Sequence, residues 1–128
     1  MRGTLRTRRH FGHVYESGRK AVGALCVVYA HEPGAEERAE LGDLAVGVVA
    51  SRKVGNAVRR NRAKRLLREA NRGLQDRVRR PCWLVLIARR AAAERGVTSG
   101  QVSDELETLL HELGCLRPPE DSSRDAVR

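Results

Sequence analysis

A strongly basic segment lies between two apolar stretches of this chain, and it restricts the fold more than any other feature. Residues 52–80 carry twelve basic and two acidic side chains, a net charge of +10 in a chain whose total is +9. From Asn56 to about Arg72 the segment has helical periodicity, with basic side chains on one arc and four apolar ones on the other: Ala63, Leu66, Leu67 and Ala70. We therefore expect an amphipathic helix that packs on a core and presents its basic arc to a polyanion.

The two stretches that flank the basic segment predict buried strands. Residues 44–51 and 82–88 are too uniformly apolar to lie at an exposed edge. Residues 24–30 are rich in β-formers and are followed by a turn at 31–34, which predicts another strand, and residues 19–23 are a candidate for a fourth. The sequence thus predicts a small, largely buried sheet.

Two further helices complete the expected fold. Thr7 is positioned to cap a helix that runs to about Ser17, and Thr98 or Ser99 to cap one that runs to about Leu113. The acidic residues 32–43 are expected to form a connecting loop, and residues 117–128 a disordered tail. The order of elements indicates an α+β fold of one domain over residues 1–116, with helices packed against a small sheet.

Composition excludes several classes of protein. No apolar run approaches the ~20 residues of a membrane span, and residues 1–10 hold four arginines with no apolar signal segment. Three cysteines cannot all pair, which favours a reducing cytoplasm. An anionic membrane surface is the alternative partner for the basic helix, but it would require bulkier apolar side chains opposite the charges. Nucleic acid is the expected partner.

Groups for catalysis are scarce in the sequence. His10 and His13 are three residues apart, but no carboxylate or cysteine lies at ligand spacing nearby, so surface histidines are the favoured interpretation. The cysteines form no CxxC pair, and no phosphate-binding, nucleophile-elbow or dinucleotide motif is present. We expect no catalytic residue in the chain, and a self-sufficient metal nuclease would need clustered carboxylates.

Phe11 and Tyr15 allow two interpretations. They lie in the basic segment 1–20, and aromatic rings among basic groups hold single-stranded nucleic acid by base stacking. An aromatic pair at i and i+4 on a short helix is also an ordinary core-facing pair. The pattern alone favours the core-facing interpretation.

Residues 51–69, Ser-Arg-Lys-Val-Gly-Asn-Ala-Val-Arg-Arg-Asn-Arg-Ala-Lys-Arg-Leu-Leu-Arg-Glu, closely resemble the signature of the protein subunit of bacterial ribonuclease P. The Arg-Asn-Arg core of that signature falls at residues 60–62. Residues 8–18, 84–89 and 99–113 resemble the first helix, a late strand and the last helix of the family, so the resemblance covers roughly residues 5–115.

The resemblance implies an α-β-β-β-α-β-α sandwich with a mixed four-stranded sheet and an unusual left-handed β-α-β crossover. It also implies a ribonucleoprotein endonuclease that removes the 5′ leader from precursor tRNA. In that enzyme the active site belongs to the RNA subunit, which also binds most of the Mg²⁺ that assists hydrolysis. The alternative function is a basic RNA-binding module of another assembly such as the ribosome.

The resemblance assigns roles to individual residues. The positions that correspond to contacts with the catalytic RNA are Arg52, Lys53, Arg60, Asn61, Arg62, Lys64, Arg65 and Arg68. The positions that correspond to the cleft for the single-stranded leader are Phe11, Tyr15, Val27 and Tyr29. The expected partners are the catalytic RNA and precursor tRNA, with neither DNA nor a membrane. This assignment reverses the preference for a core-facing aromatic pair.

Overall fold

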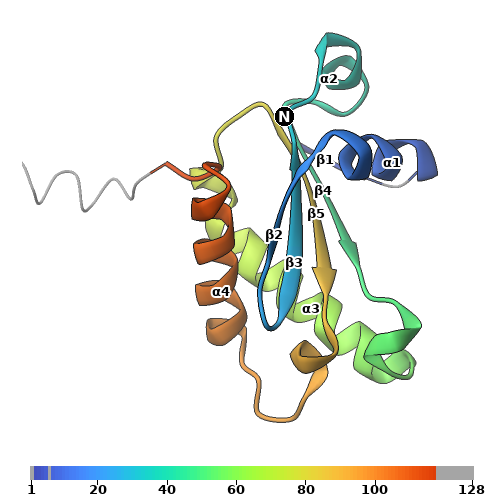
Figure 1. Ribbon diagram of the computed structural model, residues 1–128, viewed down its shortest axis with the longest axis vertical. Helices are drawn as coiled ribbons and strands as arrows, with labels where there is room; N and C mark the ends of the chain where they lie inside the picture. The colour runs from blue at the N-terminus through green and yellow to red at the C-terminus, as the bar shows by residue number, and fades with distance from the viewer. Residues whose placement is uncertain (1, 6, 118–128) are drawn as a thin grey trace, which may run out of the picture.

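A single five-stranded sheet organises the protein (Figure 1). The computed structural model describes residues 2–5 and 7–117. The strand order across the sheet is β1-β4-β5-β3-β2. The strands are β1 (Arg2–Thr4), β2 (Arg19–Val22), β3 (Cys26–His31), β4 (Leu44–Val49) and β5 (Cys82–Ala88). The α-helices are α1 (Arg8–Ser17), α2 (Ala35–Leu41), α3 (Ala57–Leu74) and α4 (Ser99–Glu112), and short 3₁₀ turns cover Arg52–Val54, Gln75–Arg77 and Arg90–Ala93.

The basic helix α3 connects two neighbouring parallel strands. β4 pairs with β5 in parallel, whereas β3 pairs with β5 and with β2 in antiparallel fashion, so the sheet is mixed. In Figure 1, β4 and β5 run downward, β5 lies to the left of β4, and α3 passes behind the sheet. The connection therefore has the left-handed sense implied by the family resemblance, against the strong right-handed preference of such units.

The main core lies between one face of the sheet and the helices α3 and α4. Every second residue of β3 is buried in it, namely Cys26, Val28 and Ala30. The four predicted apolar residues of α3 are buried in this core. The last helix contributes Val102, Leu106, Leu109, Leu110 and, just after its end, Leu113. Helical periodicity in the sequence thus identified the core-facing side chains of α3 correctly.

A second, smaller core lies on the opposite face of the sheet, beneath α1. It contains Leu5, Val14, Ala45, Trp83 and Val85, all buried. Trp83 is fully buried and its indole N–H donates to the carbonyl of Gly42 at 3.2 Å. Both faces of β5 are therefore covered, which explains why its sequence is uniformly apolar.

Three features differ from the sequence-based expectation. The four expected strands are present, and β1 adds a fifth by pairing in parallel with β4. The prediction of a loop over residues 32–43 was wrong in its central part, because residues 35–41 form α2. The basic helix was expected to run to about Arg72, but α3 continues through Gly73 to Leu74, and a Cβ at Gly73 would meet open space. The predicted disordered tail lies outside the described residues from 118 onward.

One carboxylate of α4 holds the turn between β2 and β3. Glu105 accepts hydrogen bonds from three consecutive backbone N–H groups, those of Ala24 at 2.9 Å and of Leu25 and Cys26 at 2.8 Å each. Hydrogen bonds to an ionised acceptor are stronger than neutral ones. This contact fixes the β2–β3 hairpin, and with it Tyr29, relative to α4.

Glu105→Gln is expected to lower the free energy of unfolding by about 2 kcal/mol. The amide has no charge, and its NH₂ group would face backbone N–H groups that are also donors. The midpoint of urea denaturation measures the change. Glu107→Gln is the matched control on the same helix. Glu107 pairs with Arg77 at 3.0 Å, its side chain is 44% exposed, and such a surface pair contributes about 1 kcal/mol or less. Equal effects of the two substitutions would contradict this role of Glu105.

Candidate RNA-binding surfaces

The basic surface is built on α3 and the 3₁₀ turn before it. We define it by the eight predicted residues: Arg52, Lys53, Arg60, Asn61, Arg62, Lys64, Arg65 and Arg68. The Asn56 side chain caps α3 by accepting from the N–H of Arg59 at 3.0 Å. Since the apolar arc of α3 packs on the sheet, the opposite arc faces outward, and Asn61, Arg65 and Arg68 are exposed. The structure thus brings the eight residues onto one element and the turn that leads into it.

The guanidinium groups of this surface differ in how far the protein itself engages them. Arg62 donates to the carbonyl of Val97 at 2.7 Å, so it also fastens α3 to the segment before α4. Arg65 approaches Glu69 on its own helix, at 4.0 Å. Arg60 is half-buried, and among the described residues its Nε atom has no hydrogen-bond partner. The engaged group of Arg62 positions the helix, whereas that of Arg65 stays available to an anion.

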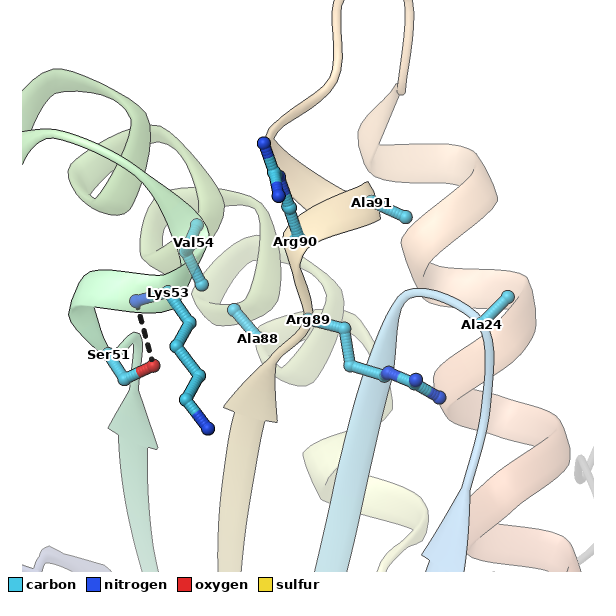
Figure 2. A pocket seen from close by; sticks show the side chains of 8 residues that line it. All are labelled: Ala24, Ser51, Lys53, Val54, Ala88, Arg89, Arg90 and Ala91. Carbon is cyan, nitrogen blue, oxygen red and sulfur yellow. Dashed lines mark hydrogen bonds between the residues drawn. The ribbon is translucent and has the colours of Figure 1, made fainter.

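The basic surface extends to the end of the sheet, where a pocket opens between the ends of β4 and β5 (Figure 2). Lys53, Arg89 and Arg90 line this pocket, and Figure 2 shows that the last two come from the segment after β5. Arg89 donates to the carbonyl of Gly23 at 2.9 Å. These two arginines were not predicted from the sequence, because they are distant from the basic helix in the chain and join it through the pairing of β4 with β5.

Three aromatic rings converge on the face of the sheet opposite to α3. The ring centroids of Phe11 and Tyr15 on α1 are 6.3 Å apart, and Tyr15 meets Tyr29 of β3 edge to face at 5.0 Å. Tyr15 is 40% exposed. Burial, and then the proximity of Tyr29, raise the pKa of the Tyr15 hydroxyl, so this group stays protonated and can donate a hydrogen bond. The Lys20 ammonium lies 5.9 Å from the centre of the Tyr29 ring, within range of a cation–π contact.

The register of the strands adds an apolar row beside these rings. Val22 pairs with Val27, Val27 with Ile87, and Ile87 with Val49, so the four side chains cross the sheet on the face that carries α1. None of the four is fully buried, and Val22 is 55% exposed. Of this row only Val27 was predicted. The other three have no signal in the sequence, because only strand register places them together.

Phe11 is held against the sheet at a glycine. A Cβ atom at Gly47 would lie 2.7 Å from two atoms of the Phe11 ring, so the ring occupies the space that any other side chain in β4 would fill. We call the combined set the aromatic surface: Phe11, Tyr15, Lys20, Val22, Val27, Tyr29, Val49 and Ile87. All four residues predicted to hold the leader belong to it.

A carboxylate of α2 connects α1 to the sheet next to the aromatic surface. Glu37 contacts His13 of α1 at 2.6 Å and His31 of β3 at 3.1 Å, and it accepts from the N–H of Gly34 at 2.8 Å. Its burial raises the pKa of the carboxyl, but the Gly34 N–H and the two imidazoles outweigh burial, so the pKa is lowered. The expectation of a surface histidine was wrong for His10, which is buried against Trp83.

Glu37→Gln is expected to destabilise the protein by about 1 kcal/mol near pH 7, because the charged hydrogen-bond acceptor is lost. The pKa of Glu37 in the folded protein is below its ordinary value of 4.5. Its contribution is therefore present above pH 4.5 and is lost as the pH falls through the lowered pKa. Urea denaturation between pH 7 and pH 3 measures this pH dependence, with Glu36→Gln at the exposed neighbouring position as control. If the free energies of unfolding of Glu37→Gln and the wild type differed by the same amount over that whole range, the predicted role of Glu37 would be contradicted.

The described residues offer no obvious metal centre. Residues 2–5 and 7–117 contain no group of three or more His, Cys, Asp or Glu side chains placed to hold a metal ion. The donor set of these described residues does not fit a resident Mg²⁺. In the same residues, no helix has the length and apolar character that crossing a membrane requires.

Fold and surfaces together define a small α+β RNA-binding protein. The family model "Ribonuclease P" matches residues 2–114, and the chain belongs to this family. It is 38% identical over 115 residues to the ribonuclease P protein component of Symbiobacterium thermophilum, covering 88% of this chain and 92% of that one. The corresponding protein of Shouchella clausii is 32% identical over 114 residues, which cover 89% of this chain and 88% of that one.

Solved structures of the family have the same fold. The ribonuclease P protein of Staphylococcus aureus superposes with a TM-score of 0.74 at 25% identity, over 91% of this chain and all of that one. The ribonuclease P protein of Thermotoga maritima superposes with a TM-score of 0.70 at 30% identity, over 85% of this chain and 96% of that one. The chain is thus a protein component of the ribonucleoprotein endoribonuclease that processes the 5′ end of tRNA, and it functions with an RNA subunit.

Proposed function

We propose that the chain divides two kinds of RNA contact between two surfaces. The basic surface binds the catalytic RNA, and the aromatic surface binds the single-stranded 5′ leader of precursor tRNA. The observation that carries the proposal is the placement of the two sets: α3 and α1 lie on opposite faces of one sheet (Figure 1), and each face has the chemistry that one of these ligands requires. The protein can therefore contact both RNAs at once.

The basic surface suits a structured RNA with closely spaced phosphates. Arginine presents a planar fork of donors that matches a phosphate, and the row at 60, 64 and 68 repeats every turn of α3. Like charges at this spacing repel each other, and an anionic ligand relieves the repulsion. Lys53, Arg89 and Arg90 extend the same electrostatic field to the end of the sheet.

The aromatic surface suits unpaired nucleotides. Bases of a single strand stack on aromatic rings with little dependence on sequence, and the partly exposed Tyr15 and half-buried Phe11 and Tyr29 offer rings for this. Lys20 supplies a charge for the phosphates beside the rings. The apolar row across the sheet provides a surface against which further bases can pack. It consists of Val22, Val27, Ile87 and Val49.

The chemistry of cleavage belongs to the RNA subunit in this proposal. Mg²⁺ bound mainly by that RNA supplies Lewis-acid assistance to phosphodiester hydrolysis. The protein's own residues raise the affinity for substrate and set the position of the leader. The proposed location of the assembled enzyme is the bacterial cytoplasm.

The test is cleavage of a 5′-labelled precursor tRNA at low Mg²⁺ with a bacterial ribonuclease P RNA alone, the protein alone, and both together. We expect cleavage at the mature 5′ end only when both are present, because the protein compensates for weak binding of substrate by the RNA. Cleavage by the protein alone would contradict the assignment of the active site to the RNA. Absence of stimulation would contradict the proposed role of the two surfaces.

A further inference from the structure

Two of the three cysteines lie against each other at the edge of the main core. Cys82 is the first residue of β5, and Cys115 lies just past the end of α4. Arg79 donates its backbone N–H to the carbonyl of Cys115 at 2.6 Å, and Val78 forms an antiparallel bridge with Leu116. These contacts place the two segments side by side, and Cys82 and Cys115 line the same pocket.

A pocket gives solvent a route to this thiol pair. Each cysteine is only 5% exposed, yet both line the same pocket at the edge of the sheet. The charged and titratable groups around the pocket come from three segments of the chain: Arg19, His31, Glu32, Arg79 and Arg80. Three of these five groups are arginines, so the pocket is electropositive and favours a thiolate.

The two thiols differ in acidity. Interaction with Cys82, and then the charge of Arg19, lower the pKa of the Cys115 thiol, while interaction with Cys115, and then burial, raise the pKa of the Cys82 thiol. Cys115 is therefore the more nucleophilic sulfur, and Cys82 is its protonated neighbour in the same pocket. Cys26, by contrast, is fully buried in β3, and burial raises its pKa to about 12.

We propose that Cys82 and Cys115 form a peroxide-reactive site that closes an intramolecular disulfide between the start of β5 and the segment after α4. The Cys115 thiolate attacks one oxygen of hydrogen peroxide, the O–O bond breaks, and the leaving hydroxide takes up a proton to give water. The sulfenic acid on Cys115 is then attacked by the Cys82 sulfur. The S–S bond forms, the S–O bond breaks, and the hydroxyl leaves as water with the proton of Cys82. Two thiols are oxidised and one peroxide is reduced to two waters.

The site is independent of the two RNA-binding surfaces. Neither cysteine belongs to the basic or the aromatic surface, and the bond would join elements that already pack together in the main core. A thiol reductant reverses the reaction, which makes the modification a reversible one.

The experiment treats the full chain with hydrogen peroxide near neutral pH, alkylates the remaining thiols in denaturant, and analyses tryptic peptides without reductant. Cys82 and Cys115 fall in separate peptides, 80–89 and 96–124, and Cys26 in a third, 21–38. We expect loss of two of the three thiols, a mass decrease of about 2 Da, and one linked species joining 80–89 to 96–124. Equal consumption of all three thiols, or disulfides only between chains, would overturn the proposal.

Single substitutions assign the two roles. Cys82→Ser is expected to leave a sulfenic acid on Cys115 that dimedone traps, with no linked peptide. Cys115→Ser is expected to slow the peroxide-dependent loss of Cys82 by about tenfold or more, since the more acidic thiol is absent. Cys26→Ser is the matched control and should leave the rate unchanged. A circular dichroism spectrum of each variant verifies folding, and an unchanged rate in folded Cys115→Ser would overturn the assignment.

Discussion

Replacing Arg65 and Arg68 together with alanine is expected to lower the affinity for the catalytic RNA about 100-fold at moderate salt. Both side chains are exposed on the outer arc of α3, and the described structure engages Arg65 only through a 4.0 Å approach to Glu69. A hydrogen bond to a charged group contributes at least about 1.5 kcal/mol, roughly tenfold in affinity per arginine. Filter binding of labelled RNA measures the change.

The salt dependence separates direct phosphate contacts from a general effect of charge. The slope of log K against log salt concentration should fall in magnitude by about 1 for each phosphate contact that is lost, hence by about 2 here. The matched control is Arg38→Ala with Arg95→Ala, which removes the same charge from exposed positions outside α3. Equal losses in the two double variants would mean that net charge, rather than the basic surface, determines binding.

The second large effect concerns the aromatic surface. Phe11→Leu combined with Tyr15→Leu is expected to weaken binding of precursor tRNA to the assembled enzyme by about 30-fold or more, because stacking of each base on a ring contributes ~1–3 kcal/mol. Binding of mature tRNA, which lacks the leader, should change little. Leucine is chosen over alanine because Phe11 also packs on Gly47 and belongs to the smaller core, so the apolar volume must be kept.

Tyr15→Phe is the conservative control for that experiment. It keeps the ring over Tyr29 and removes only the hydroxyl, so leader-dependent binding should remain within a few-fold of the wild type. Thermal melting of the variants verifies that α1 stays folded. Equal loss of affinity for leader-bearing and leaderless RNA would contradict leader binding and support a purely core-facing role for the two rings.

The basic helix was predictable because its signals are local. Its apolar residues recur with the helical period and the predicted ones are buried, and the helix begins next to Asn56, where the periodicity starts. The placement of the eight charged or polar positions, six on this helix and two on the turn before it, was also predictable. The sequence did not predict which of these side chains bond to the protein itself. The hydrogen bond from Arg62 to the carbonyl of Val97, for example, joins segments 35 residues apart in the chain.

The short helix α2 shows where local reasoning failed. Residues 35–41 contain good helix formers, but a helix of 7 residues is not stable by itself. Contacts of Glu37 with His13 and His31, and of Glu40 with Arg9, hold it against α1 and β3. The acidic composition that suggested a loop provides these contacts. β1 is similar, because three residues of an arginine-rich segment become a strand only where β4 offers a free edge.

By itself the sequence determined the α+β class, the central helices and strands, the basic arc of α3, and the family, because each depends on periodicity, composition or a contiguous motif. Only the tertiary structure decided which distant residues share a surface. Val22, Val49 and Ile87 join Val27 through strand register, Arg89 and Arg90 join Lys53 through the parallel pairing of β4 with β5, and Cys82 meets Cys115 where β5 begins beside the end of α4. Register and crossover are set by the packing of whole elements, which no local pattern specifies.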